Sequence, residues 1–307
     1  MTDDLPIKPV FDLGRTLPHL PPKKQEELSR ALGIIFEEFE DARALASSEQ
    51  KRMGRILHII LFGSFTGDTW VEDAKSGYMS DFDLLIVVNN ATVTDYSTYW
   101  YKAEERLLRH PAIQREVNFI VHDYAEVTAK LGEAQYFFSD IVREGISLYE
   151  LTTTKSLTSP ATLDEAEAKT QAREYFEQFF PKISSALSGT QHFIDEGETN
   201  DAAFMLHQAV ERAYNCLLLT HTLYSPPSHN IKFLRSLAED LDETLIGAWP
   251  RATKTDRAAF ATLKRAYIDA RYSPKYEITK EQLNWLLDRV TLLEDLVKKS
   301  CEAKLAR

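Results

Sequence analysis

The chain has few cysteines and no long apolar run. Its 307 residues include only Cys216 and Cys301, whose spacing fits neither a disulfide framework nor a metal site. So few cysteines are compatible with a reducing cytoplasm. No apolar run is long enough to span a bilayer, and the N-terminus shows no signal-peptide pattern. We therefore expect a cytoplasmic protein without a membrane segment.

Positive charge is also scarce. The chain carries 36 Lys and Arg against 47 Asp and Glu, which gives a net charge of −11. Non-specific binding to nucleic acid depends on basic surface, so RNA is not an expected partner, although a local basic pocket stays open. The apolar fraction of 44% is that of a globular protein, and the length allows two domains, each with its own core.

The periodicity of residues 1–150 predicts an α/β domain. The proline-rich first twenty residues are expected to form an extended arm. Apolar residues at helical spacing predict a helix from about residue 24 to 46, and continuous apolar runs predict buried strands. The further expectations are strands over 55–62, 83–88 and 116–121, helices over 95–108 and 123–131, and a short helix with a strand over 137–149.

The second half of the chain predicts an all-α domain. Residues 151–162 are rich in Thr and Ser and low in hydrophobicity, so we expect a linker there. Residues 163–307 show amphipathic helical patterns without a strand signal, which is typical of a helical bundle. The expected helices cover 163–196 with an interruption at Pro181, 200–224, 229–241, 256–272 and 280–304.

The most informative residues lie at the ends of the first two predicted strands. The first strand runs into Gly63-Ser64, and Asp81 and Asp83 open the second. Side chains two residues apart on a strand share a face, so the two carboxylates can point to one place. Paired carboxylate oxygens suit Mg²⁺ or Mn²⁺, which can hold substrate phosphates. A Gly-Ser turn lets backbone N–H groups approach a phosphate, and the serine hydroxyl adds a donor.

This arrangement resembles the nucleotidyltransferase superfamily of the polymerase-beta type, in particular its minimal (MNT) branch. The resemblance implies metal-dependent transfer of NMP from an NTP to a hydroxyl. It also implies that residues 63–68 form the phosphate loop, that Gly63 and Ser64 bind the nucleotide and that Asp81 and Asp83 hold the metal. The insertion over 69–80 is longer than the minimal members usually carry.

The third acid of that family is missing at its usual place. The resemblance implies an acid on the later strand, where this chain has Asn118, and an amide cannot act as a base. Glu116 lies two residues earlier and shares the face of Asn118 on a strand. We expect Glu116 to take the catalytic role if the register is displaced, and otherwise expect binding with slow or absent transfer.

The helical half resembles HEPN domains. The residues that carry this resemblance are Leu206-His207-Gln208-Ala209-Val210-Glu211-Arg212-Ala213-Tyr214 and, later, Leu263-Lys264-Arg265-Ala266-Tyr267-Ile268-Asp269-Ala270-Arg271-Tyr272. The whole chain is similar to bacterial MNT–HEPN fusions. HEPN domains are helical bundles that bind nucleotides or cleave RNA, and they commonly pair, so a homodimer is expected. Minimal nucleotidyltransferases paired with them are often antitoxins.

The ribonuclease form of HEPN needs an Arg followed by a His four to six residues later. Here Arg265 is followed by Arg271, and no histidine occurs from Lys232 onward. Arginine stays protonated, so these residues suit phosphate binding better than acid–base cleavage. The ordinary alternative for Arg265 and Asp269 is a surface pair. Tyr272 is a candidate acceptor of NMP, although a tyrosine at a helix end more often packs.

The other histidines carry no such signal. His207 and Glu211 lie four residues apart on one helix face, but no third metal ligand is in view, so an interior histidine with satisfied hydrogen bonds is expected. His229 belongs to no ligand pattern.

The sequence thus favours an enzyme that uses Mg²⁺ or Mn²⁺ to transfer NMP, with ATP as the expected NTP and a protein or small molecule as acceptor. A non-catalytic nucleotide sensor is the first alternative, favoured by Asn118 and Arg271. A toxin-type HEPN RNase neutralised by the transferase is the second. An antibiotic-modifying transferase is the third, since such enzymes also join this core to a helical bundle.

Overall fold

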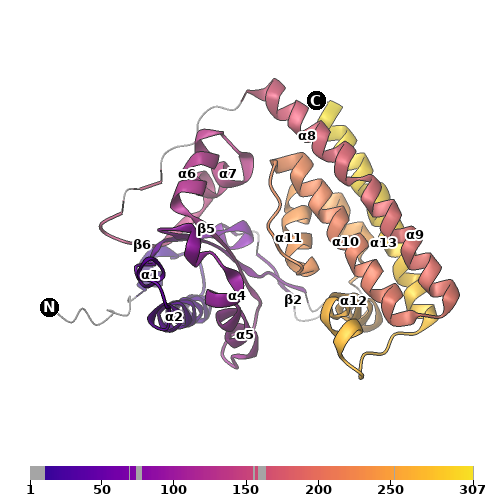
Figure 1. Cartoon of the computed structure of the whole chain (residues 1–307), viewed down its shortest axis with the longest axis horizontal. Helices are drawn as coiled ribbons and strands as arrows, with labels where there is room; N and C mark the ends of the chain where they lie inside the picture. Colours follow the sequence, from indigo (N-terminus) through magenta and orange to yellow (C-terminus); the bar gives the residue numbers. More distant parts are fainter. Residues whose placement is uncertain are drawn as a thin grey trace. The chain divides into compact units, whose positions relative to one another are not determined.

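The computed structural model describes residues 11–68, 70–73, 78–154, 156–157, 164–251 and 253–306. The chain divides into two compact units (Figure 1). The first comprises Met1–Glu72 and Met79–Thr162, and the second comprises Asp73–Tyr78 and Leu163–Arg307. Half of the predicted linker, half of the proline-rich arm and part of the insertion lie outside the described residues.

The first unit is built on a four-stranded mixed sheet in the order β5-β4-β1-β6. Strand β1 pairs antiparallel with β4 and with β6, whereas β4 and β5 are parallel. This confirms the predicted α/β class for the first half of the chain. The strands are β1 (Ile56–Phe62), β4 (Phe82–Val88), β5 (Val117–Asp123) and β6 (Ile146–Glu150), and a separate pair joins β2 (Glu72–Asp73) to β3 (Tyr78–Met79).

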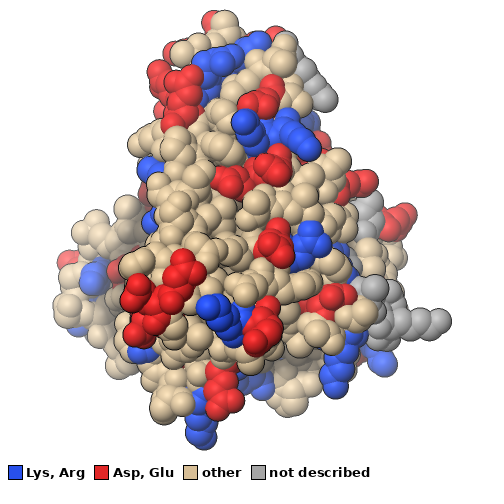
Figure 2. Space-filling view, turned by 90° about the vertical axis from the view of Figure 1, so that its right-hand side faces the viewer, with Lys and Arg blue, Asp and Glu red and all other residues tan. Residues whose placement is uncertain are grey.

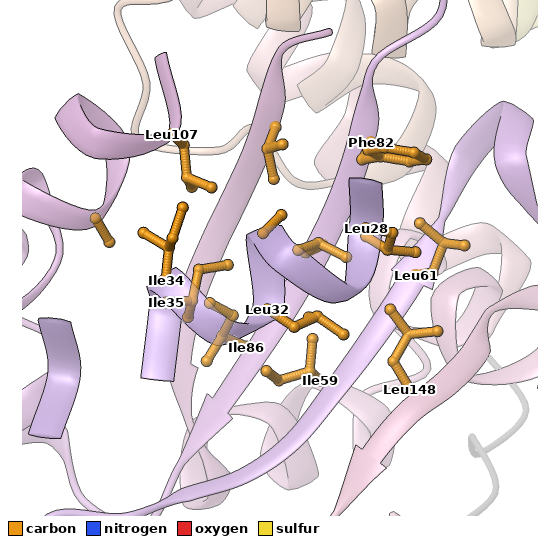
Figure 3. Close-up of a cluster of buried hydrophobic side chains, with 14 of the residues drawn as sticks. Leu28, Leu32, Ile34, Ile35, Ile59, Leu61, Phe82, Ile86, Leu107 and Leu148 are labelled. Atoms are coloured by element: carbon orange, nitrogen blue, oxygen red, sulfur yellow. The ribbon is translucent and has the colours of Figure 1, made fainter. Parts of the chain in front are cut away.

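Both faces of this sheet are covered. Every residue of β1 and of β4 is buried, which explains why their sequences are continuous apolar runs instead of alternating ones. Helix α2 (Pro22–Ala44) lies against one face, where its Leu28, Leu32 and Ile35 pack on Ile59 and Ile86 (Figure 3). Helices α6 (Tyr124–Gly132) and α7 (Tyr136–Glu144) lie on the other side of the sheet (Figure 1).

The parallel pair β4–β5 requires a crossover, which helices provide. The single helix expected over 95–108 is two helices, α4 (Tyr96–Tyr99) and α5 (Tyr101–Arg109), separated at Trp100. Trp100 is fully buried, and its Nε1 donates a hydrogen bond to the Val93 carbonyl oxygen at 2.8 Å. The break in the helix therefore coincides with an anchored core residue.

The prediction of an extended arm is wrong for residues 11–20. Helix α1 (Leu13–Thr16) forms there, and Leu13, Leu17 and Leu20 are buried in the core of the first unit. The prolines on both sides of this segment predict irregular structure, so the helical spacing of Leu13 and Leu17 does not by itself predict a helix. A second short helix, α3 (Glu49–Arg52), begins after Ser48, whose side chain caps it, and was not predicted.

The second unit is helical, as predicted, and α10 is its central element. Helix α10 packs against α8, α9, α11, α12 and α13. Pro181 separates α8 from α9 and occupies the first position of α9, which confirms the predicted interruption. The helices are α8 (Glu165–Phe179), α9 (Pro181–Glu196), α10 (Thr199–Thr222), α11 (Ile231–Leu241), α12 (Lys254–Tyr272) and α13 (Lys280–Ala306), with short 3₁₀ helices η1 (Gly63–Thr66), η2 (Ala91–Val93) and η3 (Glu243–Ala248) elsewhere in the chain.

Candidate functional sites

The two predicted metal-binding carboxylates lie at the start of β4. Asp81 directly precedes the strand and Asp83 is its second residue. Between them, Phe82 points into the core on the α2 face, so both carboxylates belong to the opposite face of the sheet. Asp81 is 6% exposed and Asp83 is 3% exposed. Buried carboxylates need partners or a cation, because isolated charges are costly to remove from water.

The Gly-Ser turn meets Asp83 directly. Phe62, the last residue of β1, pairs with Asp83 of β4 in the antiparallel register. Gly63 then has φ +76°, and a Cβ atom there would lie 3.1 Å from Asp83 Oδ2. The left-handed conformation and this close approach both favour glycine. Gly63 is the first residue of helix η1, which also contains Ser64, and Thr66 Oγ1 donates to the Gly63 carbonyl oxygen at 2.9 Å.

Asn118 stands beside Asp83 in the parallel register of β4 and β5. Its Nδ2 donates a hydrogen bond to Asp83 Oδ1 at 2.9 Å. Glu116 lies just before β5 and is half-buried, and its carbonyl oxygen accepts a hydrogen bond from the Phe82 N–H. Continuing the register by one residue pairs Glu116 with Asp81. The strand therefore brings an amide to Asp83 and an acid to the neighbourhood of Asp81.

The donor set limits the kind of metal site that can form here. Among the described residues, no group of three or more His, Cys, Asp or Glu side chains is placed to hold a metal ion. Mg²⁺ commonly uses one or two protein carboxylates and completes its shell with substrate phosphates and water. Asp81 and Asp83 fit a cation bound together with a nucleotide, and do not fit a closed metal site made of protein ligands alone.

In the helical unit, the two predicted phosphate-binding arginines have different surroundings. Arg265 is an exposed residue whose Nη1 lies 3.5 Å from Asp269 Oδ2, which matches the ordinary surface pair. Arg271 donates from Nε to the Tyr267 carbonyl oxygen at 2.7 Å. Its guanidinium lies 4.6 Å from the Phe204 ring centroid and 4.7 Å from that of Tyr267. The two arginines thus have different partners, Asp269 for Arg265 and the rings of Phe204 and Tyr267 for Arg271.

Two tyrosines that follow Arg271 in sequence, Tyr272 and Tyr276, also differ in their surroundings. Tyr272 is 73% exposed, and the Arg271 guanidinium lies 4.9 Å from its ring centroid. Tyr276 is buried, and its hydroxyl donates to the Thr262 carbonyl oxygen at 3.2 Å. Tyr272 is thus the accessible hydroxyl of the two, whereas Tyr276 has a packing role.

No signal in the sequence indicates that His229 lies next to Tyr267 and close to Arg271. His229 Nδ1 lies 3.0 Å from Glu211 Oε2, and its ring stacks on Tyr267 with centroids 4.3 Å apart and planes at 18°. His229 belongs to the loop between α10 and α11, whereas Tyr267 belongs to α12. Residues so far apart in sequence form no linear motif, so only tertiary packing brings this histidine close to Tyr267 and its neighbour Arg271.

His207 differs from the expected interior histidine with satisfied hydrogen bonds. It is fully buried, but neither ring nitrogen makes a hydrogen bond of ordinary geometry within the described residues. Its Nδ1 is 3.9 Å from Glu211 Oε2. Burial, followed by the positive charges of His229 and Arg271, lowers the pKa of His207 to about 3. The imidazole is therefore neutral at physiological pH.

Comparison with known proteins supports the assignment of the helical half. Residues 184–300 match the HEPN domain family, which confirms the resemblance predicted for this region. A solved structure of a nucleotidyltransferase-like protein from Exiguobacterium sibiricum 255-15 is also similar, with 16% sequence identity and a TM-score of 0.26. That similarity covers 87% of this chain and 78% of that chain. A search of curated proteins found no match.

In the described part of the chain, no helix combines the length and apolar character needed to cross a membrane. Figure 2 shows one face of the molecule, on which the acidic and basic side chains of the described residues are interspersed. That face lacks the continuous basic surface on which non-specific nucleic-acid binding depends.

Proposed function

We propose that the chain is a nucleotidyltransferase that moves NMP from an NTP to a hydroxyl with the help of Mg²⁺ or Mn²⁺. The observation that carries this proposal is the placement of Asp81, directly before β4, and Asp83, within β4, on one face of the sheet, with the left-handed turn at Gly63 packed against Asp83. Asp81 and Asp83 hold the cation, while the Gly63 backbone and Ser64 bind the triphosphate. When bound, the cation offsets negative charge on the phosphates during transfer.

Glu116 is the proposed general base. Asn118 cannot take the proton of an attacking hydroxyl, whereas Glu116 lies next to Asp81 by strand register. The acceptor is a hydroxyl of a protein or a small molecule, and Tyr272 is one candidate because it is largely exposed. In the helical unit, the cluster of Arg271, Tyr267 and His229 supports nucleotide binding, since it combines a cation with stacked rings.

The first test is pyrophosphate release from each of the four NTPs with Mg²⁺ or Mn²⁺. Wild type is compared with Asp81→Asn and Asp83→Asn, and with Asp41→Asn as a control at an exposed position of α2. We expect release by wild type and by the control and a loss of at least about 100-fold in the two site variants. Release that is unchanged in Asp81→Asn contradicts the proposal.

The sensor alternative predicts another outcome of the same experiment. If Asn118 marks a site that no longer transfers NMP, wild type binds NTP without releasing pyrophosphate. Isothermal titration with a non-hydrolysable NTP measures this binding. Tight binding that requires Asp83 and occurs without turnover would show that the chain is a nucleotide sensor and not a transferase.

One observation favours a second candidate function, an RNase in the HEPN domain. The sequence provides no histidine after Lys232, but His229 reaches the α12 cluster from the preceding loop and pairs with Glu211. A carboxylate that contacts one nitrogen of an imidazole can orient the ring for proton transfer from the other nitrogen. RNA cleavage by the full chain that is lost in His229→Ala, but retained in His192→Ala at an exposed position of α9, would support this function. An intact RNA substrate under all conditions excludes it.

A further inference from the structure

Arg115 is a buried arginine directly before β5, in a segment that sequence reasoning left unused. Its side chain has no exposed surface. Arginine keeps its charge under all ordinary conditions, so such burial is costly unless the charge is paired and its donors are used. The partners of Arg115 show which parts of the first unit it joins.

The charge of Arg115 belongs to a four-residue ion network, the α2–β5 network, formed by Lys24, Glu27, Glu72 and Arg115. Arg115 Nε lies 3.3 Å from Glu27 Oε2, and Nη2 lies 3.5 Å from Glu72 Oε1. Lys24 Nζ lies 3.0 Å from the same oxygen of Glu72 and 3.7 Å from Glu27 Oε2. The two positive charges of this network balance the two negative charges. The hydrogen bond from Lys24 is the main cause that holds the pKa of Glu72 below its ordinary value.

The remaining contacts of Arg115 reach the neighbours of the proposed site residues. Its Nη1 donates to the Ser80 carbonyl oxygen at 3.1 Å, directly before Asp81. Its guanidinium lies 5.0 Å from the ring centroid of Phe65, which follows Ser64, and 5.4 Å from that of Phe82. One planar group therefore contacts the residue after Ser64 and the residues on both sides of Asp81.

Glu27 fixes the segment that carries Arg115 itself. Glu27 Oε1 accepts hydrogen bonds from the backbone N–H groups of Gln114 at 2.6 Å and Arg115 at 3.1 Å. Helix α2 thus holds both the backbone and the side chain of Arg115. The guanidinium has five donors in a rigid fork, a geometry that a lysine ammonium cannot reproduce.

We infer that Arg115 is a positioning residue that fixes the Ser64 turn and the Asp81–Asp83 segment relative to each other. The inference rests on the proposed function, because only a site that uses Ser64 with both aspartates needs that spacing held. Its contacts are to residues next to Ser64 and Asp81, so Arg115 acts through these neighbours. Residues that orient metal ligands from behind typically change metal affinity roughly 10- to 100-fold when they are substituted.

The test uses the full chain with Arg115→Lys, which keeps the charge without the fork, and Arg115→Met, which removes both. Arg106→Met is the matched control, because Arg106 also pairs with two glutamates of α2, at 3.1 Å to Glu37 and 2.5 Å to Glu38, but is exposed. The first measurement is hydrogen exchange without nucleotide. We expect the amides of residues 63–66 and 81–83 to exchange roughly tenfold faster in Arg115→Lys, with residues 59–61 unchanged.

The second measurement is the affinity for Mn²⁺ in the presence of NTP. It is determined by electron paramagnetic resonance at a temperature well below the melting temperature. We expect a loss of roughly 10- to 100-fold in Arg115→Lys and no loss in Arg106→Met. Unchanged exchange at residues 63–66 and 81–83, or a uniform change across the first unit, overturns the positioning role. Wild type that binds no Mn²⁺ with NTP overturns the proposed function instead, while the exchange data still decide whether Arg115 holds the two segments.

Discussion

Asn118 and Asp83 form a buried hydrogen bond of 2.9 Å in which the amide Nδ2 donates to carboxylate Oδ1. The parallel register of β4 and β5 sets this pair side by side. The second oxygen, Oδ2, lies against Gly63 at the turn after β1. The amide therefore orients the carboxylate of Asp83 without adding a charge. An ionised acid at position 118 has no N–H to donate and, in the absence of a metal, would repel Asp83.

Substitution of Asn118 should expose this role. Asn118→Ala removes a hydrogen bond to a buried carboxylate and should lower the free energy of unfolding by about 1.5–3 kcal/mol. Asn118→Asp should also destabilise the chain in EDTA, because two carboxylates then lie side by side, and Mg²⁺ should reverse this loss. Urea unfolding in EDTA and in Mg²⁺ measures both effects. Asn284→Asp at an exposed position of α13 is the control, and an Asn118→Asp chain as stable as wild type in EDTA contradicts the prediction.

Gly63 should not tolerate a side chain. In Gly63→Ala the new Cβ would lie 3.1 Å from Asp83 Oδ2 in a left-handed backbone conformation. We expect a loss of about 1–2 kcal/mol in unfolding free energy from the backbone conformation alone. Gly33→Ala in α2 is the matched control, because a Cβ there meets nothing within 4 Å and alanine is the better helix former. Equal melting temperatures for the two variants would be inconsistent with a constrained turn.

Acid should destabilise the chain through His207. The pKa of this buried imidazole is lowered to about 3 in the folded state, so below pH 6.5 protons bind preferentially to the unfolded chain. The contribution of the neutral His207 imidazole to the free energy of unfolding is therefore fully present above pH 6.5. It is lost as the pH falls toward about 3, because the unfolded chain takes up the proton first. Between pH 6.5 and 5 this loss is about 2 kcal/mol, from about 1.4 kcal/mol per pH unit.

Urea unfolding of the full chain at pH 6.5 and pH 5 measures the effect of His207. His207→Leu should reduce the pH dependence by about that amount, because leucine cannot take up a proton. His192→Leu on the exposed face of α9 should retain the wild-type dependence. Identical pH dependence in His207→Leu and wild type would show that this imidazole is not held neutral. Charged or titratable groups near His207 are Glu211, His229, Arg271 and Tyr267, whose ring centroid lies 5.4 Å from that of the imidazole.

Tyr272 should accept NMP if the chain modifies itself. Intact-mass spectrometry after incubation with Mg²⁺ and ATP should detect an added AMP on wild type and on Tyr101→Phe, whose tyrosine is exposed in the first unit. Tyr272→Phe should remain unmodified. An adduct that persists in Tyr272→Phe, or that maps to another residue, would show that the acceptor lies elsewhere.

Local sequence patterns predict most helices and strands of this chain correctly. The strands around Ile59 and Ile86 and the helix break at Pro181 follow from apolar runs and from the missing N–H of proline. The failures occur where tertiary contacts override local signals. Leu13 and Leu17 form a buried helix inside a proline-rich stretch, and Trp100 divides one expected helix into two.

The sequence by itself determined the chemistry that is available at each site. Asp81 and Asp83 share a face because strand side chains alternate, and Asn118 is an amide whatever the fold. Tertiary structure alone decided which distant residues meet. It set Asn118 against Asp83, brought His229 to Glu211 and Tyr267, and buried Arg115 between Phe65 and Ser80. The physical reason is that periodicity reports only the face on which a side chain lies, whereas the partners of that face depend on strand register and helix packing.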